Sequence, residues 1–273
     1  MADVLAAGWL LLVGAGLLTA AGVGMRRSPY PPVQTLFYVA AYLCTRLLWR
    51  AKPPAGFPFS SGMGGVVVCN HRSSIDPFFV QVCCDRPIHW MVAREYCEHP
   101  AFRWFLRRCE VIPVNRGGID TQATKAAIRL AARGELIGML PEGRINMSSE
   151  FMLPVRPGAV LVALKARVPI LPCYIHNAPY GGTPWSPFFI PSRVRLVFGE
   201  LIDLAEYYDR QDEEGLIGQL TLRVAREIAR LANRDFQPRL AGRRWKPTAE
   251  ELAEIARSTR ARIRQSGQNR PRP

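Results

Sequence analysis

The chain has 273 residues and is 48% hydrophobic, so it is long enough for one large or two small domains with a buried core. Its 36 basic residues outnumber its 22 acidic ones, and the formal net charge of +14 favours anionic partners such as phospholipid headgroups, phosphorylated metabolites or nucleic acid. Seven cysteines without a CxxC pair argue against a disulfide framework or a zinc site, and the four histidines lack metal-binding spacing. We expect a reducing compartment, no metal and no bound cofactor.

The N-terminal region predicts attachment to a membrane. Residues 4–25 are uncharged and apolar over a length that can cross a hydrocarbon layer about 30 Å thick. Asp3 precedes this segment and Arg26 and Arg27 follow it, which is unlike a secretory signal and places the rest of the chain on the cytoplasmic face. Residues 33–49 are shorter, aromatic and end in arginines, which favours an interfacial or re-entrant helix. If they crossed instead, the rest of the chain would move to the other side.

Strand and helix patterns alternate after a Pro- and Gly-rich linker. They predict an α/β fold with a mostly parallel sheet flanked by helices, in which sites lie beyond the carboxyl ends of strands. The predicted strands are 65–69, 88–92, 111–114, 137–140, 170–175 and 194–198, and the predicted helices are 77–84, 101–108, 121–133, 158–166 and 213–233. We divide the chain into an N-terminal membrane helix pair (1–54), a soluble domain (55–238) and a basic tail (239–273) that either contacts anionic lipid or is solvated.

The first predicted strand is followed by His71, and Asp76-Pro77 favours the start of a helix. Such a corner can bring an imidazole and a carboxylate together. A carboxylate on one ring nitrogen fixes the tautomer and leaves the other nitrogen to take a proton, which is the arrangement of a general base. The same residues also fit a simpler role, in which Asp76 only caps the helix and His71 is a loop residue.

Two later strand ends also carry polar residues. Asn115 and Arg116 follow one of them, and the planar guanidinium of Arg116 is suited to phosphate, although a surface arginine in a turn is the alternative. Glu142, Gly143 and Arg144 follow another. Glu142 could bind polyol hydroxyls or pair with Arg116, Arg144 adds positive charge, and a structural salt bridge is the alternative.

Pro169 and Pro172 lie in an apolar strand that could line an acyl-chain groove or be ordinary core. The order of all these motifs resembles the glycerolipid acyltransferase family typified by 1-acylglycerol-3-phosphate acyltransferases. The matching blocks are HxxxxD at 71–76, IPVNR at 112–116, PEG at 141–143 and VPILP at 168–172, and they cover about residues 60–200.

The resemblance implies direct acyl transfer without an acyl-enzyme. His71, oriented by Asp76, would deprotonate the free hydroxyl of a lysophospholipid, which attacks the thioester of acyl-CoA or acyl-carrier protein. Arg116 and the Glu142-Gly143 segment would hold the glycerol phosphate, and the product would be phosphatidic acid. The implied partners are lysophospholipid, an acyl thioester and membrane lipid, with no nucleic acid.

One block departs from the family pattern. The family's third block usually reads EGTR, whereas Arg144 here directly follows Gly143, and residues 146–151 are similar to the tafazzin branch of phospholipid–lysophospholipid transacylases. The acyl donor and the acceptor headgroup therefore stay open.

Two other classes of protein remain as alternatives. A serine hydrolase could use Ser73 or Ser74 beside His71, but the chain has no GxSxG elbow. A membrane-tethered binding module would use the basic surface without catalysis, but no nucleic-acid-binding motif is present.

Overall fold

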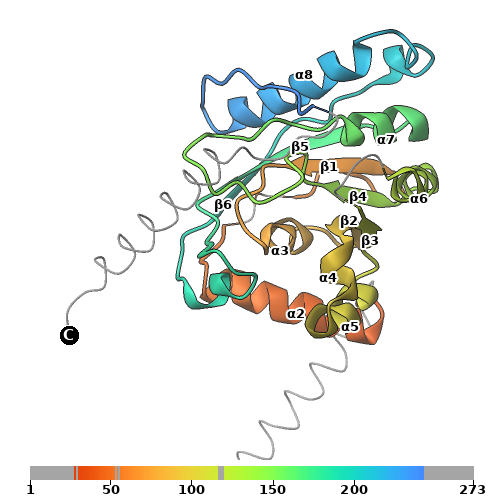
Figure 1. The fold of residues 1–273 in the computed structure, drawn as a ribbon. Coiled ribbons are helices and arrows are strands. Elements are labelled where there is room, and N and C mark those ends of the chain that lie inside the picture. The colour runs from red at the N-terminus through yellow and green to blue at the C-terminus, as the bar shows by residue number, and fades with distance from the viewer. Residues whose placement is uncertain (1–27, 29, 53, 55, 116–119, 243–273) are drawn as a thin grey trace, which may run out of the picture.

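The computed structural model describes residues 28, 30–52, 54, 56–115 and 120–242. Its centre is a six-stranded sheet with the order β3-β2-β4-β1-β5-β6 (Figure 1). The strands are β1 (Gly65–Cys69), β2 (Ile88–Ala93), β3 (Ile112–Val114), β4 (Leu136–Met139), β5 (Ile170–His176) and β6 (Arg195–Phe198). Every neighbouring pair is parallel except β5 and β6, so the carboxyl ends of β1 to β5 meet at one edge of the sheet.

Helices cover both faces of the sheet (Figure 1). The helices α6 (Thr121–Ala132), α7 (Gly158–Ala166) and α8 (Leu216–Leu231) lie on one face, and α3 (Asp76–Gln81) lies on the other. The remaining elements are α2 (Pro32–Leu47), α4 (Arg94–Glu98), α5 (Pro100–Arg108) and the 3-10 helices η1 (Ser186–Phe189) and η2 (Ala205–Tyr207). Of these, α2 packs beneath α3 and forms an additional layer on that side.

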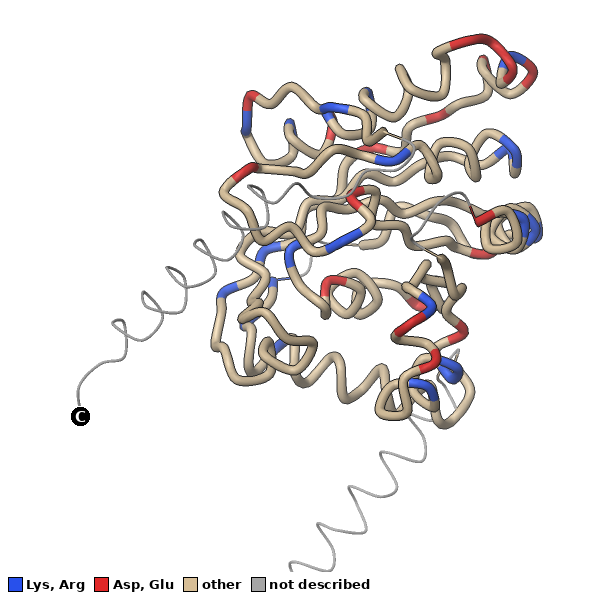
Figure 2. The backbone as a smooth tube through the Cα atoms, in the orientation of Figure 1, with Lys and Arg blue, Asp and Glu red and all other residues tan. Residues whose placement is uncertain are grey.

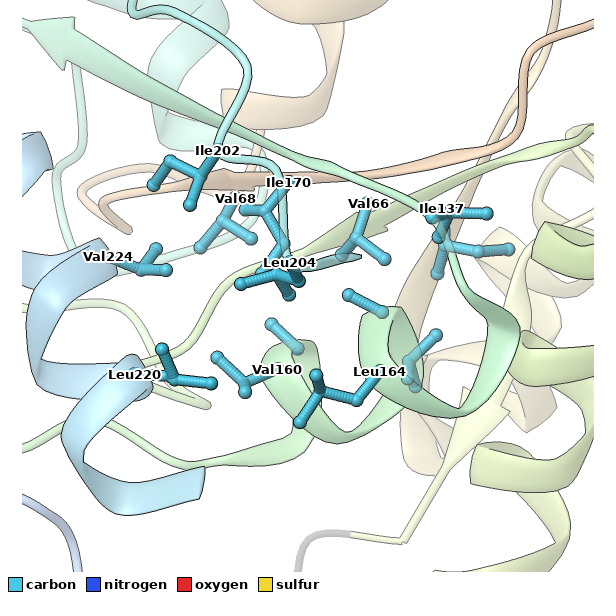
Figure 3. Close-up of a cluster of buried hydrophobic side chains, with 14 of the residues drawn as sticks. Val66, Val68, Ile137, Val160, Leu164, Ile170, Ile202, Leu204, Leu220 and Val224 are labelled. Carbon is cyan, nitrogen blue, oxygen red and sulfur yellow. The ribbon is translucent and has the colours of Figure 1, made fainter. Parts of the chain in front are cut away.

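The strand β1 lies at the centre of the hydrophobic core because its residues are apolar on both faces, as a covered parallel strand requires. Val66 and Val68 point into the cluster formed with α7 and α8, which Figure 3 shows. Val67 and Cys69 point the other way, into a cluster that includes Phe79 of α3. All five residues of β1 are buried, so the end of this strand is a rigid position for whatever follows it.

The sheet and the order of its elements confirm the predicted fold class, and each predicted strand is present with ends that differ by no more than one residue. Helix α4 was not predicted because its five residues are too few to show a helical apolar period. The helix starts at Asp76-Pro77 as predicted, but the alternative in which Asp76 only caps it is wrong. Ile75 occupies the N-cap position of α3 without a side-chain hydrogen bond, and Asp76 is the first residue of the helix.

The predicted membrane segment 4–25 and most of the basic tail, residues 243–273, lie outside the described residues. Within the described part, none of the helices combines the length and the hydropathy that crossing a bilayer requires. The predicted segment 33–49 is largely the helix α2, and its interfacial placement stays a prediction, as does the division of the chain into three regions.

Gly138 of β4 provides a test of packing between β4 and its neighbour β2. It is paired with Trp90, and an added Cβ would collide with the indole ring, which is itself only 5% exposed. We expect Gly138→Ala to lower the free energy of unfolding by about 1–3 kcal/mol, because overpacking forces the backbone or the ring to move. Urea denaturation of the detergent-solubilised full chain would measure this.

The control is Gly242→Ala, whose added Cβ meets no atom of the described residues within 4 Å. If Gly138→Ala and Gly242→Ala unfolded at the same urea concentration, the described packing of Trp90 on β4 would be incorrect.

Candidate active site

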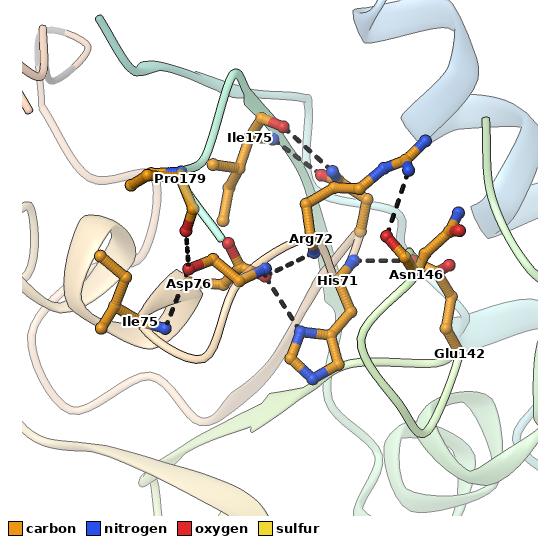
Figure 4. Close-up of polar contacts among 10 residues, drawn as sticks. His71, Arg72, Ile75, Asp76, Glu142, Asn146, Ile175 and Pro179 are labelled. Atoms are coloured by element: carbon orange, nitrogen blue, oxygen red, sulfur yellow. Dashed lines mark hydrogen bonds and ion pairs between the residues drawn. The ribbon is translucent and has the colours of Figure 1, made fainter. Parts of the chain in front are cut away.

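His71 and Asp76 meet where β1 ends. Nδ1 of His71 lies 3.0 Å from Oδ2 of Asp76, and the same oxygen accepts the backbone N–H groups of Arg72 at 2.7 Å and Ser73 at 2.8 Å (Figure 4). The carboxylate of Asp76 is fully buried. The carboxylate of Asp76 therefore points back toward the loop that precedes α3 and holds this loop in a tight turn. The turn brings Asp76 beside His71, although five positions separate them in the sequence.

This contact sets the chemistry of the imidazole ring. A carboxylate only accepts hydrogen bonds, so the neutral ring must carry its proton on Nδ1, and Nε2 is left as the basic atom. Figure 4 shows Nε2 turned away from Asp76. The side chain of His71 is 14% exposed and lines a cavity of the described structure, so Nε2 is available to a group bound there.

Glu142 supports the main chain of His71. Its Oε1 accepts the backbone N–H of His71 at 2.6 Å, and its Oε2 accepts the backbone N–H of Leu153 at 2.8 Å. The side chain is buried and does not line the cavity. This placement corrects the prediction that Glu142 binds polyol hydroxyls, because both oxygens are occupied by backbone groups.

Burial also changes the acidity of Glu142. Desolvation raises the pKa of its carboxyl group from 4.5 to about 7, and the N–H groups of Leu153 and His71 oppose this rise without cancelling it. Glu142 is thus a titratable group next to the candidate base, and it contacts the backbone of His71 instead of its imidazole ring.

A second support comes from the segment after Glu142. The backbone N–H of Asn146 donates to the carbonyl of His71 at 2.7 Å, so both backbone polar groups of His71 are held. The guanidinium of Arg72 donates to the carbonyls of Ser148 at 2.9 Å and Glu150 at 2.5 Å. Arg72 was not singled out in the sequence, because an arginine inside a loop motif gives no signal that it binds carbonyls more than seventy positions away.

Asn70 completes the corner. Its side-chain amide donates to the carbonyl of Ile175 at 3.0 Å and accepts the N–H of Ile175 at 2.8 Å. It thereby continues the pairing of β1 with β5 after the ladder has ended. The loop that carries His71 can leave the sheet at this point without unpaired buried backbone groups.

The cavity beside His71 has a volume of about 920 Å³ and is mostly apolar. Aromatic side chains from several elements form much of its wall: Phe37 and Tyr38 of α2, Phe78 of α3, and Phe102 and Phe105 of α5. Its size lies within the range of small-molecule sites. A wall of this kind suits a long hydrocarbon group.

Pro169 and Pro172, which were predicted to line an acyl groove, do not line this cavity. Pro172 is a buried member of β5, paired with Val68 of β1, and Pro169 directly precedes the same strand. Their apolar run is core of the sheet. The apolar wall of the cavity comes instead from α2, α3 and α5 together with residues of β2, β3 and β4, which only the fold brings together.

Arg156 lines the cavity and was not singled out in the sequence. Among the described residues that line the cavity, it is the one arginine or lysine. Its Nε is buried and has no hydrogen-bond partner among the described residues. It lies beside Gly143, where an added Cβ would be 3.0 Å from Nε. Gly158 and Ala159, the first residues of α7, line the cavity next to it, and helix N-terminal amides favour anions. The arrangement can hold an anionic group.

Asn115 also lines the cavity, and its backbone N–H donates to Asp120 at 2.9 Å. The carboxylate of Asp120 also accepts the N–H groups of Gln122 and Ala123 at the start of α6. These backbone donors, led by Ala123, lower the pKa of Asp120. Arg116 lies outside the described residues.

Gly143 and Arg144 differ in their placement. Gly143 has a φ of +69° and lines the cavity, whereas Arg144 is half-buried and does not line it. Arg144 was predicted to add positive charge to the site, but it does not add it at the cavity wall. Within the described ranges, no group of three or more His, Cys, Asp or Glu side chains could hold a metal ion.

The two serines near His71 have structural hydrogen bonds. Ser73 is buried and donates to the carbonyl of Pro179 at 2.5 Å, and Ser74 donates to that of Pro184 at 2.9 Å. His71 uses Nδ1 for Asp76, and neither serine is bonded to its ring in the structure. This geometry does not favour the serine hydrolase alternative.

Comparison with known proteins gives three findings. Residues 57–176 match the family model described as Acyltransferase. The chain is 26% identical over 172 residues to a 1-acyl-sn-glycerol-3-phosphate acyltransferase of Bacillus subtilis (63% of this chain, 82% of the relative), and 27% identical over 169 residues to one of Streptococcus pneumoniae (61% and 60%). The fold is similar to the crystal structure of a 1-acyl-sn-glycerophosphate acyltransferase from Thermotoga maritima, with a TM-score of 0.57, 19% identity and coverage of 82% and 90%.

The pKa of Glu142 predicts how the stability of the corner depends on pH. Because the folded pKa of about 7 lies above the ordinary 4.5, the native state loses stability as pH rises between these values. Glutamine does not titrate and leaves one backbone N–H without an acceptor. We expect Glu142→Gln to lower the free energy of unfolding by roughly 1–3 kcal/mol at pH 5, and by less at pH 8.

Chemical denaturation between pH 5 and pH 8 would measure the difference, with Glu98→Gln as the control, because the Glu98 side chain is 70% exposed. A difference between wild type and Glu142→Gln that stays constant or widens as pH rises would contradict the raised pKa.

Proposed function

The chain belongs to the glycerolipid acyltransferase family and is an acyltransferase, and we propose that it acylates the free hydroxyl of 1-acylglycerol 3-phosphate to give phosphatidic acid. The observation that carries this proposal is the His71–Asp76 pair at the wall of a cavity that is apolar along most of its length and cationic at one place. A lysophospholipid has the same combination of a hydrocarbon chain, a free hydroxyl and an anionic head.

His71 acts as the general base in this reaction. Its Nε2 takes the proton from the acceptor hydroxyl while the oxygen attacks the carbonyl carbon of the acyl donor. Asp76 stabilises the imidazolium that forms, because a buried carboxylate is bonded to the other nitrogen. When the tetrahedral intermediate collapses, a thiolate leaves with the bonding electrons and takes the proton from Nε2. The base is regenerated and no acyl-enzyme is needed.

The phosphate of the acceptor is held at the cationic end of the cavity. Arg156 and the first amides of α7 line the cavity and support this placement. Arg116, which lies outside the described residues, is our second proposed phosphate ligand. Glu142 contributes indirectly, because it holds the backbone of His71. The acyl chains lie among the aromatic side chains of α2, α3 and α5.

We also propose a thioester donor, acyl-CoA or acyl-carrier protein, and attachment to the membrane with the catalytic domain on the cytoplasmic face. The basic composition suits these anionic substrates, and the apolar segment 4–25 suits attachment. Long-chain acceptors strongly prefer lipid to water, at about 0.8 kcal/mol per buried CH₂, so the enzyme must work at the bilayer. Incubation of the purified protein with labelled lysophosphatidate and acyl-CoA, acyl-carrier protein or phospholipid in turn would separate thioester transfer from transacylation.

Removal of the imidazole tests the base. His71→Ala should lower the rate of acyl transfer by at least about 10²-fold, because general-base catalysis contributes 10²–10⁴. Labelled phosphatidic acid formed from lysophosphatidate measures the rate, and circular dichroism with membrane fractionation shows that the protein is intact. A wild-type rate in an intact His71→Ala protein would refute the proposed base.

Removal of the guanidinium of Arg156 tests the site for the anionic head. Arg156→Gln should raise the KM for lysophosphatidate roughly tenfold or more and change kcat less, because a charged hydrogen bond contributes about 1.5–3 kcal/mol. The KM for an uncharged monoacylglycerol acceptor should change little. The matched control is Arg226→Gln on the exposed side of α8. Equal effects of Arg156→Gln on the charged and uncharged acceptors would remove the role assigned to Arg156.

A further inference from the structure

The exposed large apolar side chains of the described structure are concentrated in one region. Nine of the eleven belong to α2, α5 and η1 or to the capping residues of these helices: Leu36, Val39, Tyr42, Leu43, Leu47, Leu48, Trp104, Trp185 and Phe189. Figure 1 shows that α2, α5 and the turn that carries η1 lie along the same edge of the molecule, on the side of α3 away from the sheet. We call this the α2–α5–η1 face.

Direct contacts join the three elements. Phe37 of α2 packs edge-on against Trp104 of α5, with ring centroids 5.4 Å apart. Phe102 of α5 stacks on Trp185 at 4.8 Å, and Trp185 is the N-cap of η1. The indole N–H of Trp49, just after α2, donates to the carbonyl of Pro187 in η1 at 3.0 Å. The face is therefore one continuous surface.

The elements α2, α5 and η1 form a layer that is apolar on both its inner and its outer side. On the inner side, α2, α5 and η1 contribute Tyr38, Phe105 and Phe188 to the wall of the cavity. On the outer side, Leu47 is 72% exposed, Trp104 is 59% exposed and Phe189 is 82% exposed. A helix on the surface of a water-soluble domain carries polar residues on its outer side, so this outer side requires an apolar partner.

The charge of the face indicates what kind of partner this is (Figure 2). Residues 32–47, 100–108 and 185–193 contain five arginines and no aspartate or glutamate. The five arginines are all exposed: Arg46, Arg103, Arg107, Arg108 and Arg193. Arg46 lies over the ring of Tyr42 and Arg108 over that of Trp104. Exposed aromatic and apolar groups rimmed by arginine are typical of a surface that lies on anionic lipid.

We propose that α5 and the η1 turn contact an anionic bilayer together with α2, with Trp104, Trp185 and Phe189 in the headgroup region. This inference rests on the proposed function, because the substrate is then a membrane lipid. The apolar segment 4–25 ends six residues before α2 begins, so a membrane attachment there would hold the face close to the bilayer. The layer that separates the cavity from the outside is then also the layer that touches lipid, and acyl chains have a short path to the cavity.

Lipid photolabelling of the full chain tests this proposal. The protein is reconstituted in vesicles of phosphatidylcholine and phosphatidylglycerol that contain a phospholipid with a diazirine near the carbonyl end of one acyl chain. After irradiation and digestion, mass spectrometry should find lipid adducts on the peptides that contain residues 100–108 and 185–193, and none on peptides of α6 or α8. Adducts confined to residues 1–47 would overturn the proposal.

A pair of variants sharpens the test. Phe189→Ser should reduce adducts on the 185–193 peptide roughly tenfold, because the main apolar group of that turn is lost. Leu240→Ser is the matched control, since Leu240 is also exposed but packs beside Gly218 of α8, on the other side of the sheet. Unchanged labelling in Phe189→Ser, or cross-links between two protein chains at these peptides without lipid, would contradict lipid contact there.

A second readout separates this inference from the proposed function. Phe189→Ser should acylate a short-chain, water-soluble lysophosphatidate at the wild-type rate, while its rate on long-chain substrate in vesicles falls several-fold. The wild-type protein could be labelled on the α2–α5–η1 face as expected and yet form no phosphatidic acid from any donor. That result would support lipid contact at this face and would contradict the proposed function.

Discussion

The hydrogen bond between Nδ1 of His71 and Oδ2 of Asp76 is the contact on which the catalytic account depends. It exists because a fully buried strand ends at one defined place and because the carboxylate of Asp76 draws two backbone N–H groups of the same loop toward it. A buried carboxylate is unfavourable unless donors surround it, so the loop and the side chain stabilise each other. The base is therefore oriented before any substrate binds.

The surroundings of this pair divide into a rigid side and an apolar side. On the rigid side, Glu142 and Asn146 hold the two backbone polar groups of His71, and Asn70 attaches the loop to β5. On the other side is the cavity, whose lining is mostly apolar. An apolar wall excludes water and strengthens the electrostatic effect of the few charges that remain. The base thus has a fixed backbone on one side and room for substrate on the other.

Most of the fold could be predicted because parallel strands covered on both faces have continuous apolar sequences, as Val66, Val67 and Val68 illustrate. The His71–Asp76 pair could be predicted because both residues belong to one short strand-to-helix connection, five positions apart. Three features could not. Glu142 has the sequence context of a substrate ligand, but its carboxylate faces inward to backbone amides. Arg156 lies outside every motif, and the cavity wall is assembled from helices and strands that are far apart in the sequence.

The central claim concerns the position of one proton, and nitrogen NMR of the protein labelled with ¹⁵N-histidine measures it directly. In the neutral ring of His71, the account predicts the proton on Nδ1 and an unprotonated Nε2, with Asp76→Asn weakening or abolishing that preference. A neutral His71 that carries its proton on Nε2 in the wild-type protein would contradict the account, because the atom that faces the cavity could then donate a proton but not accept one.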